Sequence, residues 1–217
     1  MGFGSRCYIV GAGDFFGKIE KGENDLVIAA DGGLKHLKAV SVTPDIIIGD
    51  FDSLGFVPDG KNVIKLPVMK DVTDTYAAVN IAKEKGYKNV ILLGCTGGKR
   101  IDHFIANLQT LIFAAENGIN AYMVGDNEVF TAVVNSQISF KEKESGTVSV
   151  FSFDRKSVVS ISGLLYETND INLTNSATLG ISNEFKGEKA TVKAIDGTVT
   201  VYWQGDIDDI LSPAYEV

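Results

Sequence analysis

The chain has little cysteine and no long hydrophobic run. Its two cysteines, Cys7 and Cys95, stand in no CxxC or Cys/His spacing, which argues against a zinc site. Such sparse cysteine is typical of a reducing compartment. No apolar run is long enough to span a bilayer, and the start, MGFGSRCYIV, lacks a charged segment followed by a long apolar one. We therefore expect a cytoplasmic protein with no membrane partner.

Positive charge is also scarce. The chain has 20 Lys and Arg against 28 Asp and Glu, a net charge of −8 and a pI of about 4.8. Binding to a nucleic-acid backbone needs clustered Lys and Arg, so no nucleic-acid partner is expected. A nucleotide is compatible with this balance, because a bound cation reverses the local sign. The 217 residues allow one large domain or two small ones.

Apolar runs and helical patterns alternate through the first half. We expect strands at residues 7–10, 26–30, 46–48, 63–66, 90–93 and 121–124, with helices near 34–40, 75–85 and 102–117. The last helix should bury one stripe of residues: Ile101, Phe104, Ile105, Leu108, Leu111, Ile112 and Ala115. This rhythm predicts an α/β domain with a mostly parallel sheet over residues 1–126.

The pattern changes after Gly125 to short alternating runs. These lie at residues 129–134, 137–140, 147–153, 158–162, 189–194 and 198–203. Asn135-Ser136, Asp154-Arg155 and Asp196-Gly197 supply turns, and Asp-Gly between two alternating runs predicts a hairpin. Residues 127–217 should therefore form an all-β sandwich or a small barrel. The expected fold class is α/β followed by all-β.

Acidic motifs follow several apolar runs of the first half. They read AADGG at 29–33, IIIGDFDSL at 46–54, KDVTD at 70–74 and GGKRIDH at 97–103. Residues after a buried parallel strand sit at its carboxyl end, where ligands of open α/β sheets bind. The motifs should converge on one rim that brings carboxylates together with an arginine and glycines. That chemistry suits a magnesium-bound polyphosphate.

The acidic motifs also have plainer interpretations. In GDFDS, Asp50 and Asp52 share a face of an extended segment with Phe51 turned inward, yet an isolated D-x-D is more often a pair of solvated aspartates. In KDVTD, Thr73 or Asp74 could simply cap the next helix. In AADGG, Gly32 and Gly33 let backbone approach a ligand beside Asp31, or merely form a strand-to-helix turn.

GCTGGKRIDH is the most specific local motif. Glycines surround Thr96, and Arg100 opens a helix whose backbone N–H groups can bind anions. Asp102 could orient Arg100, meet a substrate hydroxyl or favour the helix dipole. It is not a P-loop, because Arg100 follows Lys99 where Ser or Thr is required. GAGD at 11–14 is half of a dinucleotide fingerprint, with Phe16 in place of the third glycine.

Taken in order, these motifs resemble the thiamine pyrophosphokinase (thiamine diphosphokinase) family. The resemblance runs through ADGG, PDxIxGDFDS, KDxTD, GGxRxDHxxxN, GLLYxTND and GISN. It implies an α/β nucleotide-binding domain, a β-sandwich and a homodimer with active sites near the subunit interface. It also implies that the pyrophosphoryl group of ATP passes to the thiamine hydroxyl with Mg²⁺ as cofactor, releasing AMP.

The resemblance also implies roles for individual residues. The metal ligands would be Asp50, Asp52 and Asp74; the ATP and phosphate contacts Asp31, Asp71, Thr96, Gly97, Arg100 and Asn107; the catalytic residues Arg100, Asp102 and Asp74; the thiamine contacts Tyr166, Ser182 and Asn183. Two other functions are compatible with the acidic rim. One is a different magnesium-dependent phosphotransferase or phosphohydrolase, and the other is a non-catalytic nucleotide or ligand sensor.

Overall fold

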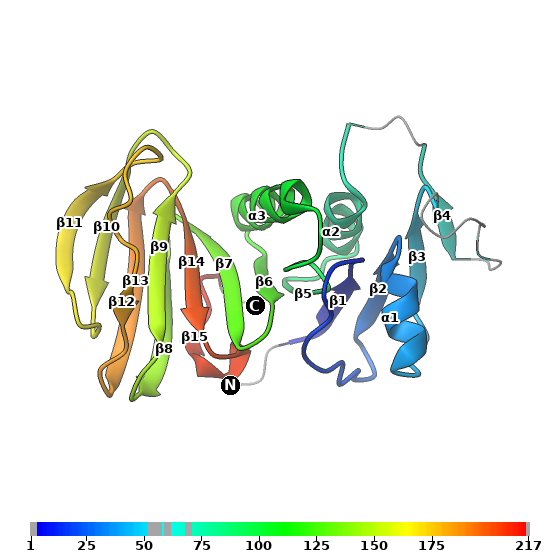
Figure 1. The fold of residues 1–217 in the computed structure, drawn as a ribbon, viewed down its shortest axis with the longest axis horizontal. Helices are drawn as coiled ribbons and strands as arrows, with labels where there is room; N and C mark the ends of the chain where they lie inside the picture. Colours follow the sequence, from blue (N-terminus) through cyan, green and yellow to red (C-terminus); the bar gives the residue numbers. More distant parts are fainter. Residues whose placement is uncertain (1–3, 52–57, 59–61, 68–70, 216–217) are drawn as a thin grey trace. The chain divides into compact units, whose positions relative to one another are not determined.

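The computed structural model describes residues 4–51, 58, 62–67 and 71–215 (Figure 1). The chain forms two compact units. The first holds the described residues of Met1–Thr110 and Met123–Asp126, and the second those of Leu111–Tyr122 and Asn127–Glu216. This division runs through a helix and a strand, so the domain boundary expected after residue 126 stays a prediction. None of the described helices is long and apolar enough to cross a membrane.

The first unit is built on a parallel sheet. Its strands run in the order β5 (Asn89–Leu93), β1 (Arg6–Val10), β2 (Leu26–Ala30), β3 (Ile46–Gly49) and β4 (Val63–Lys65). β2 and β5 are buried along their whole length, which is why residues 26–30 and 90–93 form unbroken apolar runs. The chain steps outward from β1 through β2 and β3, then returns to the other side of β1 as β5. That reversal creates a topological switch point between β1 and β5.

Helices follow the strand ends. α1 (Gly33–Ala39) and α2 (Asp74–Glu84) both pack on β1 and β2, and α3 (Ile101–Glu116) leads to β6 (Asn120–Val124). All the strands and helices expected in the first half are present, with ends that differ by about one residue. The mostly parallel α/β architecture is confirmed.

The apolar stripe expected on α3 is correct only in part. Leu111 and Ala115 of that stripe are buried, but Ile101 and Ile105 are 73% and 51% exposed. The other buried positions of the helix are Asn107, Thr110 and Ala114. Asn107 and Thr110 tolerate burial because each donates a hydrogen bond to a backbone carbonyl, of Cys95 and Ala106 respectively. A pattern based on hydrophobicity alone cannot find a buried face that contains two satisfied polar residues.

The second unit is a sandwich of antiparallel strands. One sheet contains β12 (Asn183–Glu184), β9 (Thr147–Ser152), β14 (Thr198–Gln204) and β7 (Glu128–Val134) in that order. The other contains β11 (Thr168–Leu173), β10 (Ser157–Ser162), β13 (Glu188–Asp196), β8 (Gln137–Lys143) and β15 (Ile210–Ser212). The sandwich is confirmed, although β11, β12 and β15 were not expected.

Aromatic rings fill the space between these sheets. Phe140 of β8 and Trp203 of β14 are fully buried, with ring centroids 5.2 Å apart in an edge-on arrangement. Phe185 packs edge-on against Phe140 at 5.4 Å. Edge-on aromatic pairs add to the hydrophobic stabilisation of a core. These rings form part of the hydrophobic core between the two sheets of the sandwich.

The hairpin expected at Asp196-Gly197 is wrong. β13 and β14 on either side of this turn pair with different partners, so they belong to different sheets. Gly197 donates its N–H to Asn135 Oδ1 at 2.9 Å, and Asn135 donates its N–H to the Gly197 carbonyl at 3.2 Å. A two-residue type I′ hairpin needs positive φ at both central residues, and only Gly197 has it. The turn is a corner between sheets.

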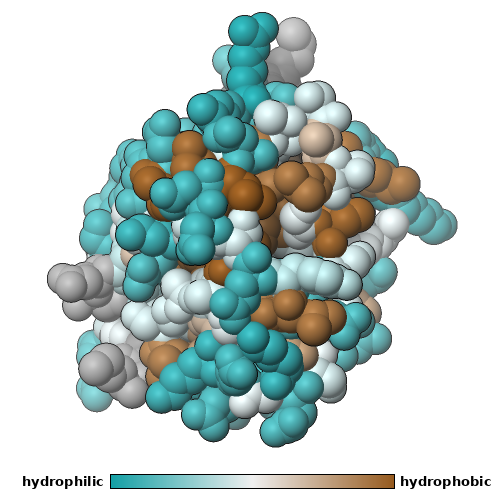
Figure 2. Space-filling view, turned by 90° about the vertical axis from the view of Figure 1, so that its left-hand side faces the viewer, coloured by the Kyte–Doolittle hydropathy of each residue, from teal (hydrophilic) through white to brown (hydrophobic). Residues whose placement is uncertain are grey.

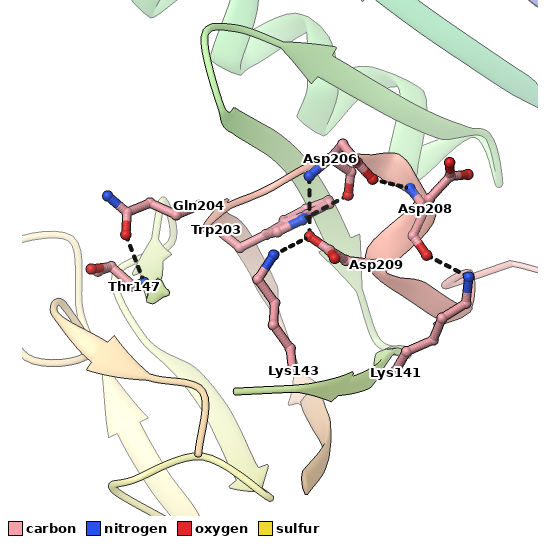
Figure 3. Close-up of polar contacts among 8 residues, drawn as sticks. All are labelled: Lys141, Lys143, Thr147, Trp203, Gln204, Asp206, Asp208 and Asp209. Atoms are coloured by element: carbon pink, nitrogen blue, oxygen red, sulfur yellow. Dashed lines mark hydrogen bonds and ion pairs between the residues drawn. The ribbon is translucent and has the colours of Figure 1, made fainter. Parts of the chain in front are cut away.

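A polar network closes one end of the sandwich (Figure 3). Trp203 Nε1 donates to the Asp206 carbonyl at 3.0 Å, and the Asp206 side chain caps the short helix η1 (Ile207–Asp209). Lys143 Nζ forms an ion pair with Asp209 at 2.7 Å and lies 5.6 Å from the centre of the Phe185 ring. These contacts fix the chain that leads from β14 to β15.

Candidate active site

A cavity of about 760 Å³ lies among the carboxyl ends of the parallel strands in the first unit. Its walls come from the segments that follow β1, β2, β3 and β5 and from the first turns of α2 and α3. The cavity therefore includes the switch point between β1 and β5, where open α/β sheets bind their ligands. The convergence of the sequence motifs on one rim is confirmed for the residues that the structure describes.

Carboxylates line one side of this cavity. They are Asp31, Asp50, Asp71 and Asp74. Asp31 has a positive φ of 46°, and its N–H donates to the Ile48 carbonyl of the neighbouring strand at 2.8 Å. Phe51, next to Asp50, has φ 62° and is 2% exposed, so its ring points inward as expected. Such backbone conformations are costly for side-chain-bearing residues and are concentrated at functional sites.

The predicted metal site falls partly outside the described residues. Asp50 and Asp74 line the cavity, but Asp52 belongs to the part of the chain that the structure does not describe. Within the described ranges, no three His, Cys, Asp or Glu side chains are grouped closely enough to hold a metal by themselves. The metal site of Asp50, Asp52 and Asp74 stays a prediction.

Thr73 caps α2. Its Oγ1 accepts a hydrogen bond from the Tyr76 N–H at 3.2 Å, which resolves the choice between Thr73 and Asp74. Asp74 is then the first helical residue, where the helix dipole favours a negative charge. Both residues line the cavity. The cap thus presents the Asp74 carboxylate at the cavity wall.

Glycines form another part of the cavity wall. Gly94, Gly97 and Gly98 all have positive φ, between 63° and 79°. The segment after β1 runs against this loop: Gly11 and Gly13 donate their N–H groups to the carbonyls of Leu93 and Gly94 at 2.8 and 2.7 Å. GAGD is therefore the backbone partner of the glycine loop, and its glycines are needed for this close approach.

Gly33 of AADGG lies against the end of β1. A Cβ placed on it would overlap the carbonyl oxygen of Val10. Of the two interpretations of this glycine, the structure favours the strand-to-helix turn. This glycine lets the start of α1 pack closely on β1.

Asn107 holds the glycine loop from α3. It is 6% exposed, and its Nδ2 donates to the Cys95 carbonyl at 2.8 Å. It also lines the cavity, so its own contact with ATP stays a prediction. Thr96 is 2% exposed and does not line the cavity, and its Oγ1 has no hydrogen-bond partner among the described residues. A contact between Thr96 and phosphate also stays a prediction.

Arg100 and Asp102 form a bidentate ion pair at the start of α3. Arg100 Nε and Nη2 donate to the two Asp102 oxygens at 2.9 and 2.6 Å. The hydrogen bond from Arg100 lowers the pKa of Asp102 to about 2, and the same bond raises the pKa of Arg100. Arg100 lines the cavity and Asp102 does not. Of the roles considered for Asp102, this geometry favours the orientation of Arg100, because a carboxylate with so low a pKa is a weak base.

Two further cationic or titratable residues line the cavity beside Arg100. They are Lys99 and His103, at the start of α3. Sequence reasoning assigned no role to Lys99, and for His103 it left open a contact with phosphate or a purely local hydrogen bond. Together with Arg100, these residues add basic groups to the cavity that the carboxylates line.

The residues expected to contact thiamine lie together in the second unit. Asn183 is 5% exposed; its Oδ1 accepts from the Tyr166 N–H at 2.9 Å and its Nδ2 donates to the Tyr166 carbonyl at 2.8 Å. Ser182 has φ 58° and donates its N–H to Ser149 Oγ at 3.0 Å. Asn183 therefore positions the exposed Tyr166. Contact of the three with thiamine stays a prediction.

Hydrophobic side chains reach the surface of the second unit. Figure 2 shows brown, hydrophobic areas between hydrophilic ones on one of its faces. The exposed hydrophobic residues near Asn183 in sequence or by contact are Leu165, Tyr166, Leu179 and Ile181, between 46% and 66% exposed. Exposed apolar side chains gathered in this way are typical of a binding surface.

Two family models match the chain. The model for the thiamin pyrophosphokinase catalytic domain matches residues 20–123, and the model for the thiamin pyrophosphokinase vitamin B1 binding domain matches residues 135–199. A comparison with curated proteins gave no match.

Solved structures share the fold. A thiamine pyrophosphokinase from Bacillus subtilis superposes with a TM-score of 0.80 at 23% identity, over 94% of this chain and 100% of that one. One from Geobacillus thermodenitrificans gives 0.78 at 23% identity, over 94% and 99%. One from Candida albicans gives 0.74 at 14% identity, over 93% and 90%. The same arrangement of elements thus recurs in bacterial and fungal proteins.

Proposed function

Because this chain belongs to the thiamin pyrophosphokinase family, it is a thiamine diphosphokinase, and we propose that the cavity of the first unit is where it holds ATP. One observation carries this proposal: carboxylates and a basic glycine loop line the same cavity at the switch point of the sheet. A polyphosphate with its bound cation needs both carboxylates and basic groups.

The polyphosphate is proposed to lie against the glycine loop. Gly97 and Gly98 bring no side chain to this wall, and α3 begins directly after it. Backbone N–H groups at the start of α3 can therefore approach phosphate oxygens, although the Gly98 N–H is already donated to Asp14 Oδ2. Arg100 adds a planar guanidinium, which binds phosphate through two parallel hydrogen bonds. Asn107 holds the loop in place by donating a hydrogen bond to the Cys95 carbonyl.

Magnesium suits the carboxylates that line the cavity. Mg²⁺ is usually held by one or two carboxylates together with waters and substrate phosphates, so no closed cluster of three protein ligands is needed. Asp50 and Asp74 line the cavity, and with Asp52 they are the proposed protein ligands. When bound, Mg²⁺ would neutralise phosphate charge and allow the nucleotide to approach an acidic wall.

The transfer requires mainly alignment and charge neutralisation. The thiamine hydroxyl oxygen attacks the β-phosphorus of ATP, and the bond between that phosphorus and the α,β-bridging oxygen breaks. AMP leaves with that oxygen, and the hydroxyl proton is lost. Arg100 is proposed to stabilise the negative charge on the group in transit. Asp102 is proposed to hold the guanidinium plane in place through its two hydrogen bonds.

Thiamine is proposed to bind at Tyr166, Ser182 and Asn183 in the second unit. Thiamine is cationic and aromatic, so the exposed face of Tyr166 suits it. The exposed apolar side chains around this position support a homodimer whose active sites lie near the subunit interface. The scarcity of cysteine supports a cytoplasmic location.

One assay tests the function. Purified protein is incubated with ATP, Mg²⁺ and thiamine, and the products are separated by chromatography. Equal amounts of thiamine diphosphate and AMP are expected, and chelation of Mg²⁺ should stop the reaction. Release of ADP or phosphate would indicate another phosphotransferase or phosphohydrolase, and binding without turnover would indicate a sensor.

A variant tests the metal site. Asp52→Asn should greatly reduce turnover while leaving the thermal unfolding temperature unchanged, because it removes one ligand charge and little volume. Wild-type kinetics and an unchanged Mg²⁺ dependence in this variant would remove Asp52 from the site.

Light scattering at several protein concentrations tests the homodimer.

A further inference from the structure

Asp14 lies against the glycine loop, although it is distant in sequence and outside every motif that the resemblance assigns. Its Oδ2 accepts a hydrogen bond from the Gly98 N–H at 2.9 Å. Its own N–H donates to the Thr96 carbonyl at 3.1 Å, and the two residues form an isolated antiparallel bridge. Asp14 thus contacts the loop through both its backbone and its side chain.

The bond to Gly98 controls the most deformable part of the loop. Gly97 and Gly98 are consecutive residues with φ of 63° and 79°, and glycine resists such changes less than any other residue. A Cβ on Gly97 would overlap the Asp14 carboxylate, so the side chain packs directly on this glycine pair. By accepting the Gly98 N–H, Asp14 sets the orientation of the peptide between the two glycines.

Asp14 is itself held in place. Backbone hydrogen bonds from Gly11 and Gly13 to Leu93 and Gly94 fix the segment that precedes it. The next residue, Phe15, stacks on His36 of α1 with ring centroids 5.3 Å apart and an interplanar angle of 15°. The carboxylate is therefore presented from a fixed segment, although the residue itself is exposed.

We propose that Asp14 is a positioning residue for the pyrophosphoryl transfer, which acts by holding the Gly97–Gly98 peptide so that Arg100 faces the cavity. This inference rests on the proposed function. Arg100 follows Gly98 by two residues, so a reoriented peptide redirects its guanidinium. Because Arg100 is assigned to the transition state, the loss of Asp14 lowers kcat more than it raises the KM for ATP.

The test compares Asp14→Ala with Asp14→Asn. Asp14→Ala should lower kcat about tenfold, as expected for the loss of a charge-assisted hydrogen bond, with a KM for ATP within about twofold of wild type. Asp14→Asn keeps an oxygen that can accept the Gly98 N–H, so it should restore most of the rate. Glu23→Ala is the matched control, since Glu23 is an exposed carboxylate of the same unit that has no hydrogen bond or ion pair to the described residues.

A double variant separates positioning from general stability. If Asp14 acts through Arg100, Asp14→Ala combined with Arg100→Ala should be no slower than Arg100→Ala alone. Additive losses would overturn the proposal. So would wild-type kcat in Asp14→Ala, or an Asp14→Asn variant as slow as Asp14→Ala, because the latter would mean that the charge itself acts.

A readout independent of turnover keeps this proposal distinct from the proposed function. Amide hydrogen exchange in peptides covering Gly97 to Arg100 should be faster in Asp14→Ala than in wild type and near wild type in Asp14→Asn. Unchanged exchange in Asp14→Ala would refute the role of Asp14 in the loop. Failure of the wild-type protein to form thiamine diphosphate would refute the proposed function instead, and the exchange experiment would still decide whether Asp14 holds the loop.

Discussion

Asn107 offers the sharpest single perturbation of the candidate site. Its Nδ2 donates to the Cys95 carbonyl at 2.8 Å, and both residues are nearly fully buried. Asn107→Ala removes the donor and leaves that carbonyl without this partner inside the protein. Because Cys95 belongs to the glycine loop that leads to Arg100, the change should affect both stability and catalysis.

The expected size follows from the burial of the contact. Leaving one buried polar group unsatisfied costs about 1–3 kcal/mol, so we expect Asn107→Ala to lower the free energy of unfolding by about 2 kcal/mol. For a protein of this length that corresponds to a fall in Tm of roughly 4–8 °C. If a similar energy is lost in placing the loop for the transition state, kcat falls by more than about tenfold, since about 1.4 kcal/mol is a factor of ten.

Asn117, directly after the end of the same helix, is the matched control. Its Nδ2 donates to the Phe113 carbonyl of α3 at 2.7 Å, and it does not line the cavity. Asn117→Ala should therefore change stability only slightly and leave kcat unchanged. Thermal unfolding and the thiamine diphosphate assay measure both quantities. Equal effects of the two substitutions, or wild-type stability and kcat in Asn107→Ala, would refute the argument that Asn107 holds the loop.

Other predictions address charge, protonation and packing. Arg100→Ala should lower kcat by on the order of 10²-fold or more, and a change confined to the KM for thiamine would contradict its role. The carboxyl carbon of Asp102 should titrate near pH 2 by NMR. The pKa of Asp102 is lowered in the folded state, so the ionised carboxylate stabilises the fold above its ordinary pKa. This stabilisation is lost as the pH falls through about 2. The effect is small because the ion pair with Arg100 is exposed. Burial raises the pKa of the Cys7 thiol and raises that of Cys95 to about 12, so a thiol reagent at pH 8 should label neither until the protein unfolds. Phe140→Ala should lower the free energy of unfolding by about 3–5 kcal/mol in a denaturant titration, and a loss below about 1 kcal/mol would mean that the ring is not part of the core.

The parallel sheet of the first unit could be predicted because its strands are buried on both faces. Residues such as 26–30 and 90–93 show this as continuous apolar runs, and their carboxyl ends must share a rim. The placement of Asp31 and Asp50 beside one cavity follows from that rule, because each comes directly after a strand. The local sequence was therefore sufficient to place a residue at the site when that residue comes directly after a buried strand.

Short or polar strands could not be predicted in this way. β12 has two residues and β15 has three, and they are stabilised by pairing with β9 and β8. Their own sequences carry no alternation to mark them. The Asp196-Gly197 corner was missed for a related reason, because only the packing of the sandwich determines whether the next strand stays in the same sheet.

By itself, the sequence determined the order of strands and helices, the acidic rim and the glycine loop. Buried strands require apolar residues and unusual backbone conformations require glycine, so both can be recognised from residue type. Tertiary structure alone decided which neighbours those residues meet. Gly33 meets the Val10 carbonyl, Asn107 meets the Cys95 carbonyl, and Asp14 meets the Gly98 N–H across 84 positions of the chain. Such contacts join different elements, so their geometry exists only once those elements pack together, as β1 and β5 do beneath Asp14 and Gly98.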